Sequence, residues 1–204
     1  MQRLRFLEKG RKIKMESLSE RKQNFRLEVK KVPDLSYSER DNISSAIAER
    51  LIHMPQFNSS SSIFAFVGIG NEPDTSAIIE HALKAGKRVS VPLCMSDGIM
   101  EAREIHSLSE LKTGKYGIKE PGIESLVVAP EAIDFVLVPC VACTMDGRRL
   151  GHGKGYYDRF LPKTEALRVM ICAQRFVFDD IPSDELDCKS DFVVTENECY
   201  SALR

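Results

Sequence analysis

The sequence lacks a long run of apolar residues. Its longest mostly apolar stretch, residues 133–145, is interrupted by Asp134 and Pro139, whereas a helix needs ~20 apolar residues to cross a bilayer. No apolar segment of a secretory signal follows the basic first residues. We therefore expect a cytoplasmic protein that is neither secreted nor bound to a membrane.

The cysteines lack the spacing of a metal or disulfide framework. Of the six, only Cys140 and Cys143 have a suggestive separation, and a zinc ribbon would need a second cysteine pair or a histidine pair. A redox pair normally begins a helix, but this one follows a strand-like run at 135–138. We expect reduced thiols, with Cys140 and Cys143 packed as small buried side chains.

Length and composition indicate one folded domain. The chain has 204 residues, of which 43% are hydrophobic and 29% are charged, values close to the globular average. The net charge of −1 conceals a basic head, because residues 1–31 hold eleven Lys/Arg and four Asp/Glu. Such a basic segment is compatible with binding to nucleic acid, with binding to an anionic small ligand, or with a targeting role. We expect a basic N-terminal extension over residues 1–14, which leaves mitochondrial import open, and a single α/β domain over residues 15–204.

Helix and strand patterns alternate along the chain. We predict helices over 17–31, from 36 to before Pro55, over 74–86 and over 155–161, and strands over 63–67, 88–91, 133–138, 167–173 and 192–194. Segments 56–62 and 112–122 are predicted loops, and Asp97-Gly98 indicates a turn between strands. This alternation favours an α/β fold: a three-layer, open, largely parallel sheet with helices on both faces, Rossmann-like. Ligands of such sheets bind beyond the carboxyl ends of strands, which selects residues 68–75 and 139–158.

The richest chemical signal lies at residues 148–159, Arg-Arg-Leu-Gly-His-Gly-Lys-Gly-Tyr-Tyr-Asp-Arg. Alternate glycines let backbone N–H groups converge on one anion without interference from Cβ atoms. Lys154 adds a mobile positive charge, and Arg148 and Arg149 have the guanidinium groups that clamp phosphate or carboxylate oxygens. The segment therefore predicts a polyphosphate site.

Two better-known phosphate loops are excluded. The Walker pattern fails because Arg148 stands where its first glycine belongs and Gly155 follows the lysine. The dinucleotide pattern fails because its third glycine comes one residue early.

The whole string resembles the signature of the 5-formyltetrahydrofolate cyclo-ligase family, also called methenyltetrahydrofolate synthetase. The matching residues are Pro139, Gly147, Arg149 to Gly151, Gly153 and Lys154 to Asp158. Further similar stretches are 22–26, 71–75, 116–121, 187–191 and 193–196, in the family's order. The chain departs from the pattern at Cys143 and Thr144, where the family usually has an aromatic residue and an acid. We expect this change to reshape the folate side of the site and to leave the phosphate cradle intact.

The resemblance implies an ATP- and Mg²⁺-dependent ligase that closes 5-formyltetrahydrofolate to 5,10-methenyltetrahydrofolate and releases ADP and phosphate. It implies folate, polyglutamylated or not, and ATP as the ligands. We expect a monomer that binds neither nucleic acid nor membrane. The formyl oxygen would accept the γ-phosphoryl group of ATP, N10 would attack the carbon, and phosphate would leave, a sequence that needs positioning and charge neutralisation.

The resemblance also implies the site residues. The ATP-binding set is Lys22, Arg26, Arg149, Leu150, Gly151, His152, Gly153, Lys154, Gly155, Tyr156 and Tyr157. The folate-binding set is Val67, Glu72, His152, Gly153, Lys154, Gly155 and Tyr156. Asp158 and Asp187 would hold Mg²⁺, and Lys154 and Arg149 would be the catalytic cations.

Alternatives stay open at this point. The acids and bases named above also suit helix caps, salt bridges or solvated helix faces, and one of the two tyrosines suits core packing. The sequence is also compatible with a different enzyme that acts on a phosphate-bearing ligand and has a similar α/β sheet. A second alternative is a non-catalytic module that binds anions or nucleic acid. Against the module, residues 1–31 contain only Phe6 and Phe25 as aromatic residues for base stacking.

Overall fold

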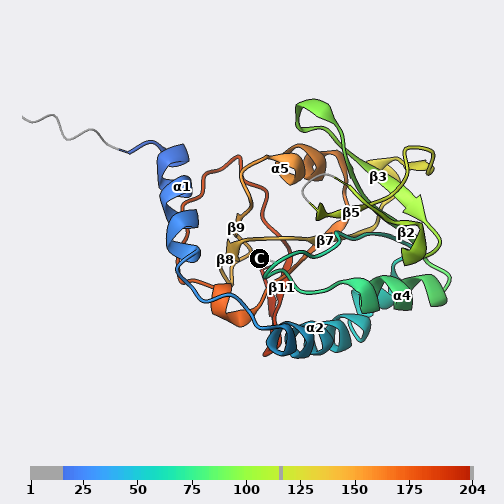
Figure 1. Ribbon diagram of the computed structural model, residues 1–204, viewed down its shortest axis with the longest axis horizontal. Coiled ribbons are helices and arrows are strands. Elements are labelled where there is room, and N and C mark those ends of the chain that lie inside the picture. Colours follow the sequence, from blue (N-terminus) through green and yellow to red (C-terminus); the bar gives the residue numbers. More distant parts are fainter. Residues whose placement is uncertain (1–15, 115–116, 203–204) are drawn as a thin grey trace, which may run out of the picture.

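The computed structural model describes residues 16–114 and 117–202 (Figure 1). The predicted extension, residues 1–14, and the first residue of the family-like stretch 116–121 lie outside the described residues. Within the described part, no helix has both the length and the apolar character that crossing a membrane requires.

An eight-stranded sheet forms the centre of the molecule, in the order β12-β11-β10-β7-β1-β2-β3-β6. Five neighbouring strands run parallel, and β12, β3 and β6 are antiparallel to their neighbours. The strands are β1 (Ser62–Phe64), β2 (Arg88–Cys94), β3 (Met100–Ile105), β6 (Val127–Val128), β7 (Phe135–Val138), β10 (Leu167–Ile171), β11 (Phe192–Val194) and β12 (Cys199–Ser201). Two further ladders pair β4 (Lys112–Thr113) with β5 (Lys119–Glu120) and β8 (Ala142–Cys143) with β9 (Arg149–Leu150).

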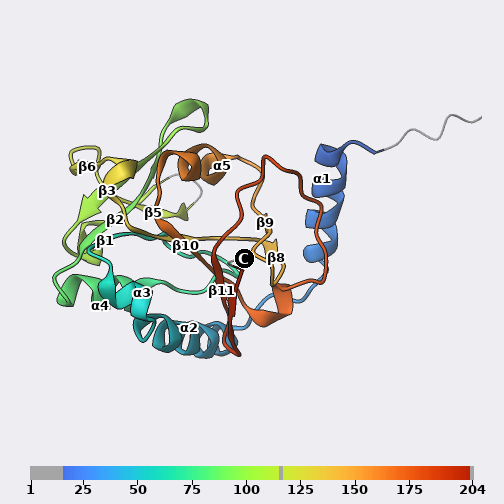
Figure 2. The same ribbon diagram turned by 180° about the vertical axis from the view of Figure 1, so that it is seen from behind.

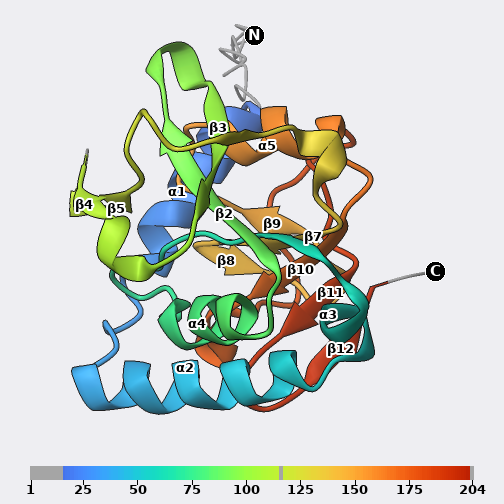
Figure 3. The same cartoon turned by 90° about the vertical axis from the view of Figure 1, so that its right-hand side faces the viewer.

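Helices cover both faces of the sheet. The α-helices are α1 (Leu18–Val29), α2 (Tyr37–Ile52), α3 (Pro55–Ser59), α4 (Ser76–Lys84) and α5 (Tyr156–Phe160). Single 3₁₀ turns are η1 (Ser96–Gly98), η2 (Leu108–Glu110), η4 (Pro130–Ala132), η5 (Leu161–Lys163) and η6 (Gln174–Phe176). Figure 3 shows α2, α3 and α4 below the sheet and α5 above it, while α1 stands at one end of the sheet near β8 and β9 (Figures 1 and 2). The three-layer, largely parallel α/β prediction is confirmed.

The central strands are parallel and covered because nearly all of their residues are apolar. Every residue of β1 and of β7 is buried, as expected for strands packed on both faces. The first two helices begin at complete capping boxes, in which Ser17 pairs with Glu20 and Ser36 with Glu39. These local signals are the reason that both helices start where the sequence predicted.

Several predictions need correction. Segment 56–62 is not simply a polar loop, because α3 lies in it and places the fully buried ring of Phe57 edge-on to Phe135 at 5.5 Å between ring centroids. The predicted loop 112–122 contains the short β4–β5 ladder, and the predicted strand 88–91 continues through Pro92 to Cys94. The turn at Asp97-Gly98 does join two strands, β2 and β3. Cys140 and Cys143 are buried as expected.

Candidate active site

A cavity of about 360 Å³ opens at the carboxyl ends of β1, β2 and β7, where its lining includes Phe66, Cys94 and Pro139. The fifteen site residues that the sequence analysis nominated all line this one cavity: Lys22, Arg26, Val67, Glu72, Arg149, Leu150, Gly151, His152, Gly153, Lys154, Gly155, Tyr156, Tyr157, Asp158 and Asp187. They come from α1, the segment after β1, the glycine loop and the segment before β11, so the fold brings together residues up to 165 positions apart.

The glycine loop, residues 151–155, leaves a hairpin and enters a helix. β8 and β9 form the hairpin, and α5 begins after Gly155. Gly153 and Gly155 have φ angles of 89° and 70°, a left-handed region that side chains disfavour. Arg159 ties the loop to the β2–β3 hairpin, since its guanidinium donates to the Lys154 carbonyl at 2.6 Å and to the Gly98 carbonyl at 2.9 Å. The loop backbone is thus held from outside the cavity.

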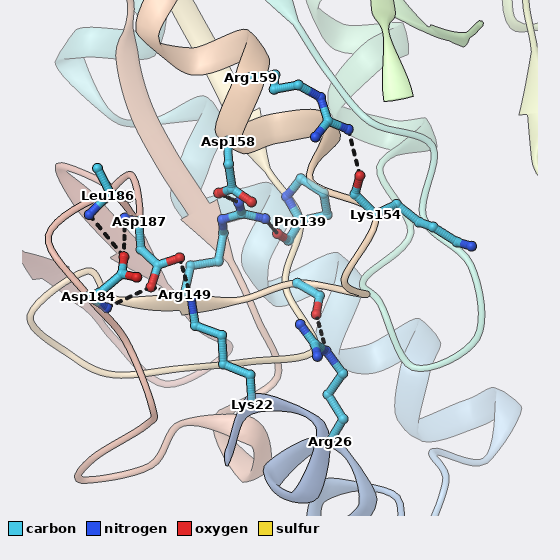
Figure 4. Close-up of polar contacts among 11 residues, drawn as sticks. Lys22, Arg26, Pro139, Arg149, Lys154, Asp158, Arg159, Asp184, Leu186 and Asp187 are labelled. Carbon is cyan, nitrogen blue, oxygen red and sulfur yellow. Dashed lines mark hydrogen bonds and ion pairs between the residues drawn. The ribbon is translucent and has the colours of Figure 1, made fainter. Parts of the chain in front are cut away.

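Two cations of α1 project toward the glycine loop and the cavity. Lys22 and Arg26 are four residues apart, so they share one helix face. Arg26 Nε donates to the Gly151 carbonyl at 2.7 Å, and Lys22 Nζ lies 2.6 Å from the Asp187 carboxylate (Figure 4). Burial lowers the pKa of Arg26, against the opposing influence of Asp158 and Asp187. The sequence therefore places two positive charges against the loop from a helix distant along the chain.

Arg149 lies at the base of the cavity with only 6% of its side chain exposed. It forms an ion pair with Asp158 and lies over the Tyr157 ring, 5.6 Å from the ring centroid. Its buried Nε–H has no hydrogen-bond acceptor within residues 16–114 and 117–202. Since a buried unpaired donor is costly, a turn of the guanidinium that brings this N–H to an anionic oxygen of a ligand would be favourable.

Asp187 is fixed by a tight turn of its own segment. The backbone N–H of Asp184 donates to its carboxylate at 2.8 Å, and the Asp184 carboxylate accepts from the backbone of Leu186 and Asp187 in return (Figure 4). Asp187 and Asp158 are therefore two carboxylates in one cavity, each already paired with a cation. Oxygen donors of this type are the ligands that Mg²⁺ prefers.

Glu72 joins the segment after β1 to the glycine loop. Its carboxylate accepts from the Ile69 backbone N–H at 3.0 Å and lies 3.1 Å from His152 Nε2. Only 10% of the Glu72 side chain is exposed, compared with 61% for His152. Glu72 is thus a fixed acceptor in the cavity wall, and His152 is at its rim.

The two tyrosines of the loop differ in their surroundings. Tyr157 is buried against Phe64, and burial raises the pKa of its phenol. The Tyr157 hydroxyl has no hydrogen-bond partner in the part of the chain that the structure describes. Tyr156 is only partly buried beside the core. The expectation that one tyrosine packs in the core holds for Tyr157.

Sequence reasoning missed most of the apolar wall of the cavity. The lining residues that were not named as site residues are Phe66, Ile69, Pro92, Cys94, Met100, Ile118, Glu120 and Pro139, of which Ile69 and Pro139 lie in the segments selected as ligand-binding. Most belong to, or adjoin, β1, β2 and β3, where apolar residues look the same whether they face the core or a ligand. The stretch 116–121 carried a family signal that would have found Ile118 and Glu120.

Two expectations about individual residues are wrong. Arg148 does not line the cavity, because its guanidinium pairs with Asp146 at 3.0 Å and Asp180 at 2.5 Å on the outer side of β9. Cys143 and Thr144 are buried and do not line the cavity either, so their departure from the family pattern does not alter the cavity wall directly.

Known proteins resemble the chain over nearly its whole described length. The model of the 5-formyltetrahydrofolate cyclo-ligase family matches residues 17–196. A probable 5-formyltetrahydrofolate cyclo-ligase of Schizosaccharomyces pombe is 30% identical over 172 residues, which cover 76% of this chain and 84% of that protein. The 5-formyltetrahydrofolate cyclo-ligase of Mus musculus is 30% identical, and the match covers 86% of this chain and 94% of that protein.

Solved structures agree with these sequence relatives. The structure of Aquifex aeolicus 5,10-methenyltetrahydrofolate synthetase superposes with a TM-score of 0.77 at 32% identity, covering 91% of this chain and 92% of that one. A Mycoplasma pneumoniae 5,10-methenyltetrahydrofolate synthetase, 23% identical, shares the fold with a TM-score of 0.70 over 86% of this chain and 98% of its own.

Proposed function

The chain belongs to the 5-formyltetrahydrofolate cyclo-ligase family, and on that basis we propose that this ligase closes 5-formyltetrahydrofolate to 5,10-methenyltetrahydrofolate with ATP and Mg²⁺. ADP and phosphate are the other products. The observation that carries the proposal is the composition of the cavity. Its four cations come from α1, β9 and the glycine loop, and they share one side with Asp158 and Asp187. Its apolar residues come mainly from the strands β1 to β3 or adjoin them, and this side also contains Glu72 and Glu120.

The charged side suits a triphosphate. Lys22, Arg26, Arg149 and Lys154 supply four cations around the backbone of the glycine loop, and such clusters neutralise the charge that develops during phosphoryl transfer. The unpaired Nε–H of Arg149 supplies a donor that a phosphate oxygen satisfies. The γ-phosphoryl group moves to the formyl oxygen, which turns a poor leaving group into a good one.

Asp158 and Asp187 would hold Mg²⁺, which neutralises phosphate charge when bound. In the structure these carboxylates pair with Arg149 and Lys22, which are themselves expected phosphate ligands. When ATP binds, the two cations turn to phosphate oxygens and the carboxylate oxygens become available to the metal. In the ligand-free protein, Asp187 thus neutralises Lys22, and Asp158 neutralises Arg149.

The apolar side suits a pterin ring. Val67, Ile69 and Met100 offer flat apolar contact, and Glu72 and Glu120 are the carboxylates of this wall. A pterin presents N–H donors at its edge, and carboxylates are their natural acceptors. Glu72 would face the edge that bears the formyl group, with Tyr156 lining the folate beside the loop. N10 of the folate then attacks the activated carbon, and phosphate leaves.

The test is the near-ultraviolet absorbance of the methenyl product, measured with each component omitted in turn. We expect product only when 5-formyltetrahydrofolate, ATP and Mg²⁺ are all present, and ADP release that depends on the folate. An isomerase or transferase on a similar sheet would consume no ATP. Absence of turnover in a folded preparation would defeat the proposal.

A further inference from the structure

Three cysteines meet beside the active site without lining it. Cys140 follows β7, Cys143 ends β8 and Cys172 follows β10. Their Sγ atoms all lie within 4.8 Å of one another. The three residues are 7%, 0% and 3% exposed, and none of them lines the cavity. The parallel register of β7 and β10 brings the ends of these strands together, and Cys140 and Cys172 follow those ends, while Cys143 comes from the separate β8–β9 ladder.

The sulfur spacing fits one bound ion. Three sulfurs placed in a plane around a metal at about 2.3 Å are separated by about 4.0 Å from one another. The observed upper limit of 4.8 Å requires each sulfur to move by less than 1 Å, which rotation about the Cα–Cβ bond supplies. No change in strand pairing is needed.

The donor set selects the kind of ion. Among the described residues, the group contains only sulfur, with no histidine or carboxylate in it. Thiolates favour soft ions such as Cu(I), whereas structural zinc takes four ligands in a tetrahedron. A buried trigonal set of three sulfurs therefore suits Cu(I) better than Zn(II).

We propose that Cys140, Cys143 and Cys172 bind one Cu(I) ion through three thiolates. Three S–H bonds give up their protons to solvent, three S–Cu bonds form, and no electron is transferred. This buried site would carry a net negative charge. Arg149 stands directly opposite Cys143 in the β8–β9 ladder, so a guanidinium lies on the neighbouring position to offset that charge.

The test is an anaerobic titration of the reduced full-length protein with Cu(I) in competition with a chromophoric Cu(I) chelator. The matched background is the variant Cys94→Ser/Cys188→Ser/Cys199→Ser, which removes the less buried thiols and keeps the cluster. We expect this background to withhold one Cu(I) per chain from the chelator. Adding Cys143→Ala should weaken binding by at least 100-fold. Absence of binding by the background, or undiminished binding after Cys143→Ala, would overturn the proposal.

Two further measurements keep the result independent of variant folding. X-ray absorption of the Cu(I)-loaded background should show three sulfur neighbours, and a two-sulfur environment would overturn the trigonal assignment. Zn(II) added alone should bind at least 100-fold more weakly than Cu(I). Tighter zinc binding would contradict a three-ligand site. Because ATP and folate are absent from all of these experiments, their outcome is separate from that of the proposed reaction.

Discussion

Lys154 contributes a charge to the glycine loop, and other residues hold the backbone at this position. The Lys154 carbonyl is held by Arg159, and the adjacent glycines set the chain direction. Lys154→Ala should therefore keep the fold and lose transition-state stabilisation, lowering kcat on the order of 10²–10³-fold. The methenyl absorbance assay measures the loss of kcat, and thermal melting, with Tm expected within about 2 °C of the parent, measures whether the fold is kept.

The matched control is Lys84→Ala, because Lys84 is 80% exposed on α4, on the far side of the sheet from the glycine loop. This variant should retain full turnover. If Lys154→Ala also retains it, the assignment of a catalytic cation to this loop is wrong.

Tyr157 offers a second residue-scale prediction because its buried hydroxyl has no partner among the described residues. Tyr157→Phe keeps the ring contacts with Phe64 and Arg149 and removes an unsatisfied polar group that costs about 1–3 kcal/mol. We expect an unchanged or higher free energy of unfolding in urea. We also expect both KM values to stay within about two-fold of the parent, because the hydroxyl is buried out of reach of a ligand in the cavity.

A loss of more than about 1 kcal/mol on Tyr157→Phe would show that the hydroxyl already has a stabilising partner. Tyr156→Phe serves as the comparison for the free energy of unfolding, since this partly buried neighbour carries the same hydroxyl group.

At the scale of elements, α1 is attached to the rest of the molecule mainly by side chains of the site. Val29 is its one buried residue, and Phe25 meets Phe178 edge-on at 5.2 Å between ring centroids. The remaining cross-links are those of Lys22 and Arg26. We expect ATP with Mg²⁺ to slow amide hydrogen exchange in α1 by at least three-fold.

The internal control for this experiment is α2, which buries Ile43, Ser44, Ile47, Ala48 and Leu51. Its exchange should not change on nucleotide addition. Equal protection of both helices, or of neither, would contradict the view that α1 closes on the nucleotide.

The turn between β8 and β9 supplies a pH-dependent prediction. Burial opposes ionisation of Asp146, but hydrogen bonds from Thr144, Arg148 and Lys189 outweigh it and lower the Asp146 pKa to about 2. A lowered folded-state pKa means that the stabilisation is complete above the unfolded value near 4. It is lost as the pH falls toward 2. Asp146→Asn should therefore lower the free energy of unfolding by about 0.5–1 kcal/mol at pH 7, the range of exposed ion pairs.

Urea denaturation at pH 7, 5, 4 and 3 measures this difference. We expect it to be constant between pH 7 and 5 and to shrink below pH 4. The exposed Glu165→Gln provides the comparison. A difference that grows on acidification would mean that Asp146 is stabilised in its protonated form.

At the scale of the whole molecule, the sequence predicted the central architecture because its signals were local and strong. Continuous apolar runs produced β1 and β7, and capping boxes fixed the starts of α1 and α2. The edge strands β6 and β12 were not predicted, because strands of two or three residues depend on their neighbours more than on their own residues. The short helix α3 was missed because a single aromatic residue, Phe57, anchors it.

The candidate site also has a part that the sequence predicted and a part that it did not. The glycine loop was predictable because its residues are contiguous, whereas the apolar wall is assembled from separate strands. Arg148 and Arg149 illustrate the limit. Arg149 lies in β9 and lines the cavity, whereas Arg148 lies in the turn before β9, where Asp146 and Asp180 hold its guanidinium. The sequence does not say where the turn ends and the strand begins.

The last prediction concerns the basic residues that precede the described domain. The family match begins at residue 17, and the capping box of Ser17 and Glu20 begins α1 from within the domain. Deletion of residues 1–14 should therefore leave kcat and both KM values within about two-fold and Tm within about 2 °C, because both the family match and the helix cap begin after that segment. Melting curves and the methenyl assay on the deleted and full-length chains test this. A ten-fold loss of turnover at unchanged Tm would place the basic segment in the reaction, and a large drop in Tm would make it part of the domain.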